Sequence, residues 1–319
     1  MRSHALHYGL GVLLLTLGSL CWARVTYSPP FAPEATEMWT HGGTVLKCSL
    51  NYDIRDFGQA EFISYAGREI KTGMILHTYR DILVRDRTKI RFIASRPEWT
   101  SDTREYLLGS IFAYPGFEPV LGPRLARELL YQLNNGNQIL MPFLSDNYVT
   151  PNLIVPIISP QGFKKHYEDF VDCSRKLLSV NFSDIEYVPL VFKYRSPELN
   201  STTLKYFREM IDYVNADSAV TKIEVRAYAY DMDSAEENEE LAGLRASYIH
   251  QALIDAGIGE QLISMVPFNQ QFQSNPVSSL PGDHDPRMRN GMIVLERDDD
   301  NLDYDLELDR FPDEVSVDE

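Results

Sequence analysis

The sequence lacks the residue patterns of the common catalytic and metal centres. It contains no Gly-x-Ser-x-Gly nucleophile elbow and no glycine loop that cradles phosphate. The histidines beyond residue 23 are scattered and show no metal-ligand spacing. We therefore expect no catalytic residue, no metal site and no cofactor, and we predict that the chain is not an enzyme. The histidines concerned are His41, His77, His166, His250 and His284.

Basic residues are also scarce. The chain has 30 Lys and Arg against 46 Asp and Glu, a formal net charge of −16. Residues 296–319 hold 12 acidic and 2 basic residues, so this tail alone contributes −10. Nucleic-acid binding needs basic surface against phosphate, so no nucleic-acid partner is expected. We expect residues 298–319 to form a disordered acidic tail.

No long hydrophobic run occurs after the first residues. Residues 1–23 resemble a secretory signal, with Arg2 as the positive end, an apolar run over Leu10–Leu20 and a cleavage site at Cys21-Trp22-Ala23. The run is short for a membrane span. Lipidation at Cys21 is an alternative, although Leu20 is a poor residue to precede a lipidated cysteine. We expect an exported protein located in the periplasm, on the cell-wall or outer-membrane side.

Two cysteines would remain after cleavage, Cys48 and Cys173. Cys48 alternates with polar neighbours and so faces inward on a strand, while Cys173 lies on the apolar face of a helix expected over Gly162–Leu178. Two thiols that face one core in an oxidising compartment predict a disulfide. The alternative is a pair of buried structural thiols.

The first domain, expected over residues 24–184, carries mainly β-patterned segments. Their alternation predicts an antiparallel sheet or partial barrel with helices. We expect strands at Thr44–Asn51, Ala60–Tyr65, Arg68–His77, Lys89–Ser95, Gln138–Leu144 and Leu153–Ile158, and helices at Pro123–Leu133 and Gly162–Leu178.

The pattern changes near Asp184. From there the order β, α, β, α, β, β predicts a second domain over residues 185–297, with its helices on one sheet face, so the fold class is α+β. The expected elements are a strand at Glu186–Tyr194, a helix at Leu199–Asn215, a strand at Lys222–Tyr230, a helix at Glu237–Ala256 and strands at Gln261–Phe268 and Gly291–Glu296.

A loop-to-helix signature lies inside the second domain. Asn238, Leu241 and Arg245 are spaced i, i+3 and i+7, on one helix face, and Ala246 follows the arginine. This pattern resembles the OmpA-like peptidoglycan-binding family. The resemblance implies that the ligand is the zwitterionic end of diaminopimelate, which an Asp holds by its ammonium and an Arg by its carboxylate.

The signature departs from the family pattern at several positions. Tyr230 stands where the family Asp falls, and Asp231 follows one residue later, so it takes that role only with a shifted loop. Leu244 replaces a frequent second Arg, and both arginines expected after Asn290 are missing. The peptidoglycan-binding residues implied by the resemblance are Asp231, Asn238 and Arg245. The alternative for Arg245 is a solvated helix residue.

Four short stretches of the chain share a second resemblance. They are residues 48–50 (Cys-Ser-Leu), 56–62 (Asp-Phe-Gly-Gln-Ala-Glu-Phe), 170–173 (Phe-Val-Asp-Cys) and 182–185 (Phe-Ser-Asp-Ile). Together they resemble the MotY family of the sodium-driven polar flagellar motor. The resemblance implies a scaffold that joins a MotX-like partner and the flagellar basal body to peptidoglycan, and that retains stators of the PomA/PomB type.

Two other functions stay open at this point. One is a general OmpA-like cell-envelope protein that anchors to peptidoglycan without a role in the motor. The other is a periplasmic enzyme with its site in the first domain, against which the missing catalytic patterns count.

Overall fold

The computed structural model describes most of the chain between Arg24 and Asp298. The described residues are 24–27, 38–79, 87–97, 100–101, 104–145, 152–229, 232–266 and 291–298. The expected signal segment and nearly all of the acidic tail lie outside them.

The first domain contains two sheets that share one core. The elements are β1 (Arg24–Tyr27), β2 (Trp39–Gly43), β3 (Lys47–Ile54), β4 (Gly58–Tyr65), β5 (Thr72–Thr78), β6 (Thr88–Ser95), β7 (Glu105–Ala113), β8 (Val120–Leu121), α1 (Pro123–Asn134), β9 (Gln138–Leu140), β10 (Phe143–Ser145), β11 (Asn152–Ile158) and α2 (Phe163–Ser174). One sheet has the order β2-β3-β4-β5-β8. The other has the order β1-β11-β9-β6-β7, with β10 beside β11. All the described pairings in this domain are antiparallel except that of β1 with β11.

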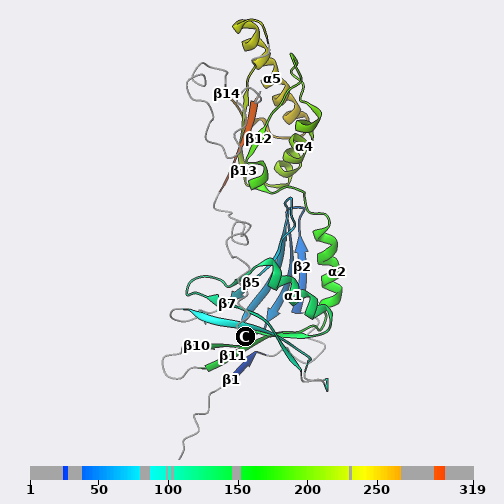
Figure 1. Ribbon diagram of the computed structural model, residues 1–319, viewed down its shortest axis with the longest axis vertical. Helices are drawn as coiled ribbons and strands as arrows, with labels where there is room; N and C mark the ends of the chain where they lie inside the picture. Colours follow the sequence, from blue (N-terminus) through cyan, green and yellow to red (C-terminus); the bar gives the residue numbers. More distant parts are fainter. Residues whose placement is uncertain are drawn as a thin grey trace, which may run out of the picture.

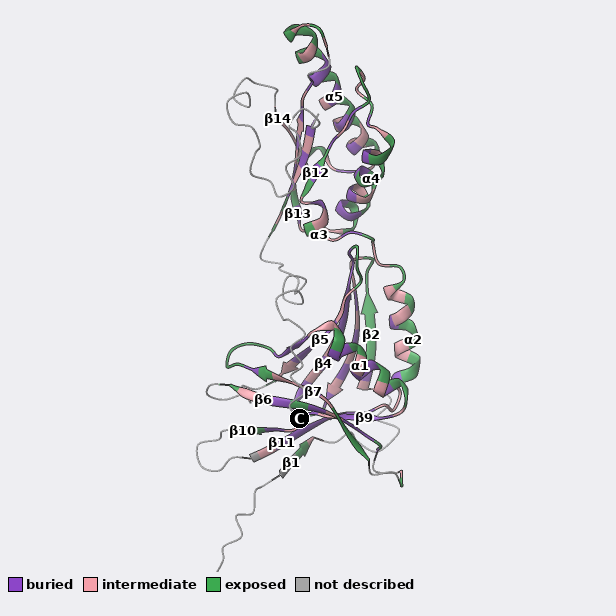
Figure 2. Ribbon diagram, viewed as in Figure 1, coloured by how far each residue is buried: buried purple, intermediate pink, exposed green. Residues whose placement is uncertain are grey.

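Alternation along the strands builds this core. In β3 every second residue is buried, from Cys48 to Ile54, and the intervening polar residues face outward. Pro123 begins α1, where its missing N–H costs nothing, and α1 buries one leucine face (Figure 2). Helix α2 lies along β2 (Figure 1) and contributes Phe163 and Phe170 to the same core.

The second domain has the predicted order and confirms the α+β fold class. Its elements are α3 (Phe182–Ile185), β12 (Tyr187–Pro189), α4 (Ser201–Ala216), β13 (Val220–Ala227), α5 (Ala235–Asp255), the short 3₁₀ helix η2 (Glu260–Leu262), β14 (Ile263–Val266) and β15 (Gly291–Arg297). The sheet order is β12-β15-β13-β14, with β13 and β14 parallel because α5 crosses between them. Helices α4 and α5 lie on the same side of this sheet (Figure 1).

Several strands differ from the sequence expectation for local reasons. The strand expected up to Tyr194 ends at Pro189, and Phe192 bridges to Leu199 instead. The single strand expected over Gln138–Leu144 is divided into β9 and β10 around Pro142, which cannot donate to a ladder. The nine-residue strand β7 was missed; a register shift in its pairing with β6 shows that its alternation is interrupted.

Candidate functional site

A disulfide joins the sheet and a helix of the first domain, as the sequence predicts. Cys48 on β3 and Cys173 on α2 are bonded, with Cα atoms 6.0 Å apart and 125 positions between them in sequence. Gly43, at the end of β2, allows this approach, because a Cβ there would lie 2.6 Å from Cys173 Sγ. The bridge therefore fixes α2 against β3, and the close packing around it leaves no room for a side chain at Gly43 of β2.

The loop before α5 is held by the side chain of Asn238. Its Oδ1 accepts the Met232 N–H (3.1 Å), and its Nδ2 donates to the carbonyls of Ser234 (2.8 Å) and Met232 (3.3 Å). Ser234 and Glu237 form a capping box at the start of the helix. In this arrangement the side-chain amide of Asn238 fixes the loop, because both its oxygen and its nitrogen are hydrogen-bonded to the backbone.

Arg245 is completely buried, with a relative exposure of 0%. Its Nε, Nη1 and Nη2 donate to the carbonyls of Ser196 (3.1 Å), Tyr228 (2.8 Å) and Lys193 (3.4 Å). The guanidinium also stacks over the Phe192 ring, 4.8 Å from its centroid. The side chain is not the solvated residue that the sequence allowed.

Arg245 therefore connects three segments of the second domain: the chain after β12, the end of β13 and α5 itself. Burying a guanidinium is costly unless its donors are satisfied, and backbone carbonyls satisfy them here. A ligand carboxylate would reach this group only after the covering residues move. The proposed partner Asp231, like Tyr230, lies outside the described residues, so its separation from Arg245 stays a prediction.

The junction between the domains is made by two turns of the first sheet. The Leu178 N–H donates to the Val45 carbonyl (2.8 Å), and the Gly67 N–H donates to the Leu178 carbonyl (3.0 Å). Leu46, in the β2–β3 turn, packs against the hydrophobic core of the second domain together with Leu178. The connecting chain is thus bonded to both turns, and an apolar side chain crosses from one domain to the other.

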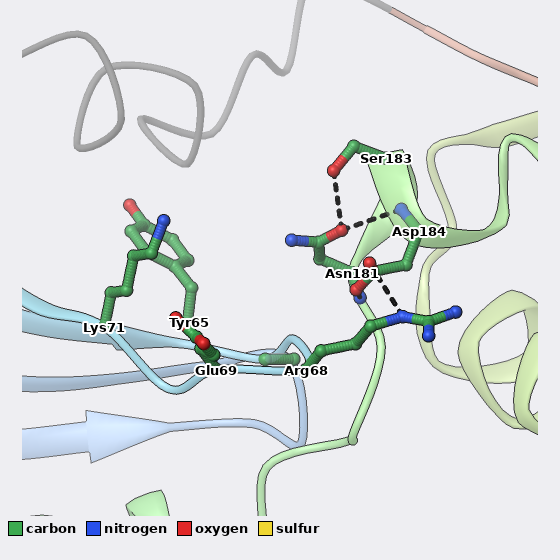
Figure 3. Close-up of a pocket in the computed structure, with 8 residues that line it drawn as sticks. Tyr65, Arg68, Glu69, Lys71, Asn181, Ser183 and Asp184 are labelled. Carbon is green, nitrogen blue, oxygen red and sulfur yellow. Dashed lines mark hydrogen bonds and ion pairs between the residues drawn. The ribbon is translucent and has the colours of Figure 1, made fainter. Parts of the chain in front are cut away.

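A charged pair adds to this junction. Arg68 Nε donates to Asp184 Oδ1 (3.1 Å), and the Arg68 guanidinium lies 5.7 Å from the centroid of the Tyr206 ring. Asp184 also closes the capping box of α3 with Asn181 (Figure 3). Beside the pair is a polar pocket of about 220 Å³, so a molecule held there would touch both domains. Its lining residues are Tyr65, Ala66, Arg68, Glu69, Lys71, Asn181, Ser183 and Asp184.

Sequence reasoning predicted the disulfide between Cys48 and Cys173 but missed the junction, and the peptidoglycan-binding role of Asn238 and Arg245 stays a prediction. The alternation over Thr44–Asn51 put Leu46 on the same strand face as Cys48, whereas in the structure β3 begins at Lys47 and Leu46 packs against the second domain. None of the helices that the structure describes combines the length and the hydropathy of a membrane span. In the described part of the chain, no group of three or more His, Cys, Asp or Glu residues is placed to hold a metal ion.

Comparison with known proteins relates this chain to MotY. Residues 31–179 match the family described as the MotY N-terminal domain, so the predicted MotY-like character of the chain is confirmed. Along 261 residues the chain is 22% identical to the sodium-type flagellar protein MotY of Vibrio parahaemolyticus serotype O3:K6 (strain RIMD 2210633). That match covers 82% of this chain and 88% of the relative.

Solved structures match the chain over a shorter stretch. The periplasmic domain of Helicobacter pylori MotB is 23% identical, with 39% of this chain and 86% of that one covered and a TM-score of 0.27. The OmpA-like domain of FopA1 from Francisella tularensis subsp. tularensis SCHU S4 is 22% identical, with 35% and 75% covered and a TM-score of 0.27.

Proposed function

We propose that this protein is a periplasmic, non-enzymatic scaffold of the flagellar motor that links the basal body and the stator to peptidoglycan. The observation that carries the proposal is the match to a flagellar MotY, which extends across both domains. In this proposal the first domain docks onto the basal body and a MotX-like partner, and the second domain attaches to the cell wall.

The junction supports a scaffold role on mechanical grounds. A stator must be held still while the rotor turns, so a linking protein has to transmit load between its two attachment points. Here the connecting chain is hydrogen-bonded to the turns of the first sheet, and Leu46 packs against the core of the second domain. A load on either domain therefore passes through packed side chains and backbone hydrogen bonds.

The motor role is tested in a strain of the source organism that lacks the gene. We expect the strain to lose swimming, and its PomA/PomB-type stators to lose their position at the flagellar base, with both restored by the full chain. A Cys48→Ser chain should restore less, because the first domain loses its cross-link. Normal swimming with correctly placed stators would reject the motor role, and uniform distribution around the cell would favour a general envelope anchor.

Peptidoglycan attachment by the second domain is the second part of the proposal. Asp231, Asn238 and Arg245 are the residues proposed for it, with Arg245 reached after a rearrangement of the residues that cover it. The test is cosedimentation of the full chain with purified peptidoglycan. We expect the native chain to sediment and Arg245→Lys to sediment at least about tenfold less, because an ammonium cannot form the two parallel hydrogen bonds of a guanidinium.

Leu244→Ala is the matched control, since Leu244 is the exposed neighbour on the same helix. It should sediment like the native chain. Thermal unfolding of each variant separates a loss of ligand from a loss of fold. If the native chain stays in the supernatant at every peptidoglycan concentration, the second domain does not anchor to the wall.

A further inference from the structure

Two histidines far apart in sequence meet on the surface of the first domain. His41 lies on β2 and His166 on α2, and their Nδ1 atoms are 3.1 Å apart. The ring planes are inclined by 54°, with centroids 5.3 Å apart. The side chain of His41 is 38% exposed, so the pair is open to small ions from solvent.

The separation of the two nitrogens suits a shared metal ion. Metal–nitrogen bonds to imidazole are about 2.0–2.1 Å long, and two such bonds spanning this gap would meet at about 100°. That angle lies between the right angle of tetragonal or octahedral coordination and the tetrahedral angle. Small rotations of the two rings would turn both lone pairs toward a common point.

A carboxylate lies near the outer nitrogen of one of the two rings. A carboxylate oxygen of Asp169 lies 3.6 Å from Nε2 of His41. A carboxylate on the side of the ring away from the metal is a common arrangement behind metal-bound histidines.

We propose that His41 and His166 form a binding site for one divalent late transition-metal ion, with copper(II) bound more tightly than nickel(II) or zinc(II). Water supplies the remaining coordination positions. The preference follows from the general order of stability for nitrogen ligands, in which copper(II) exceeds its neighbours. The residues lie 125 positions apart in the chain, so the spacing rules that predicted no metal site had no means of pairing them.

The bound ion would hold the same helix as the disulfide, against the neighbouring strand of the same sheet. His166 precedes Cys173 by seven positions on α2, about two helical turns. One end of the helix is fixed to β3 by sulfur, and the metal would fix the other end to β2. Binding would therefore stabilise the folded first domain in proportion to the metal concentration.

The test uses the full mature chain, freed of metal with a chelator and titrated with copper(II). We expect binding of one ion, with nitrogen hyperfine structure from two imidazoles in the electron paramagnetic resonance spectrum and a higher unfolding temperature. His41→Gln and His166→Gln should each bind at least about tenfold more weakly, since even a lost outer partner costs that much. Asp169→Asn should weaken binding less than either.

His250→Gln serves as the control, because His250 lies on α5 of the other domain. It should bind copper like the native chain, which shows that the loss of a histidine outside the pair leaves binding unchanged. Circular dichroism confirms that each variant is folded. Equal copper affinity in the native chain, His41→Gln and His166→Gln would overturn the proposal, as would a spectrum with fewer than two imidazole nitrogens in the native chain.

Discussion

The two domains each hold a helix against a sheet, but they do so with different chemistry. The first uses a covalent bond between Cys48 and Cys173. The second uses the buried guanidinium of Arg245, which donates to carbonyls of neighbouring segments. A disulfide acts mainly by restricting the unfolded chain, whereas a buried arginine acts only in the folded state and bears a desolvation cost. The first domain should therefore depend on redox conditions, and the second should not.

Removing the disulfide should have the largest effect on the stability of the protein. Cys48→Ser opens a loop of 125 positions, so the free energy of unfolding should fall by about 4–5 kcal/mol in the chain-entropy model. Thermal unfolding under oxidising conditions measures the loss. The native chain after reduction should unfold like the variant, and an unchanged unfolding temperature in Cys48→Ser would contradict the role of the bridge.

Removing the arginine should give the next largest effect. Arg245→Ala leaves the part-buried carbonyls of Ser196 and Tyr228 without this donor and removes a fully buried side chain, and we expect a loss of about 3 kcal/mol in the second domain. Unfolding followed by hydrogen exchange assigns the loss to one domain. Leu244→Ala, at an exposed position, should cost little, and the Arg245→Ala loss should be the same in oxidised and reduced protein.

The disulfide and the buried arginine also differ in how far the sequence predicts them. Cys48 and Cys173 were paired from alternation and helical spacing, because two inward-facing sulfurs in one core leave few alternatives. The role of Arg245 was not predictable in the same way. Its partners are backbone carbonyls of Lys193, Ser196 and Tyr228, and a carbonyl carries no side-chain signature in the sequence.

Most elements of both domains were predictable from periodicity, but strand ends were not. Tertiary pairing decided where β12 stops, and an interrupted alternation hid β7. The junction was unpredictable for a related reason. Whether Leu46 packs into its own domain or into the next depends on how two folded units meet, which no local pattern records.

Replacing Asn238 should have a smaller effect on the stability of the second domain. Asn238→Ala removes the side chain that holds the loop before α5, and we expect a loss of about 1–2 kcal/mol. Faster hydrogen exchange at the Met232 amide would report the released loop. Glu239→Ala, at the next and exposed position, is the control, and equal exchange rates in the two variants would contradict the assignment.

The smallest effect is a pH dependence located in the first domain. His77 lies between Glu61 (2.8 Å) and Glu118 (2.7 Å). Hydrogen bonding to Glu61 raises the pKa of His77, with help from Glu118 and against burial. The folded state therefore favours protonated His77, and this contribution is complete below the ordinary histidine pKa and lost as the pH rises through the raised one.

Comparing the native chain with His77→Gln isolates this contribution. We expect the native chain to be more stable by about 1 kcal/mol or less near pH 5.5, with the difference vanishing near pH 9. Chemical denaturation at several pH values measures it. The pKa of Glu61 is lowered mainly by its hydrogen bond to His77, against burial, so the same pair weakens again in strong acid. A difference that grows from neutral to alkaline pH would contradict the assignment.

The contact made by Leu46 has a practical consequence for anyone who wishes to study the halves apart. Leu46 belongs to the first domain by chain position and to the second by packing, together with Leu178 of the connecting chain. Cutting the protein between its domains would expose Leu46 on one piece and the apolar residues that it contacts on the other. The isolated halves should then tend to self-associate, and a Leu46→Ser exchange should reduce the self-association of the first half.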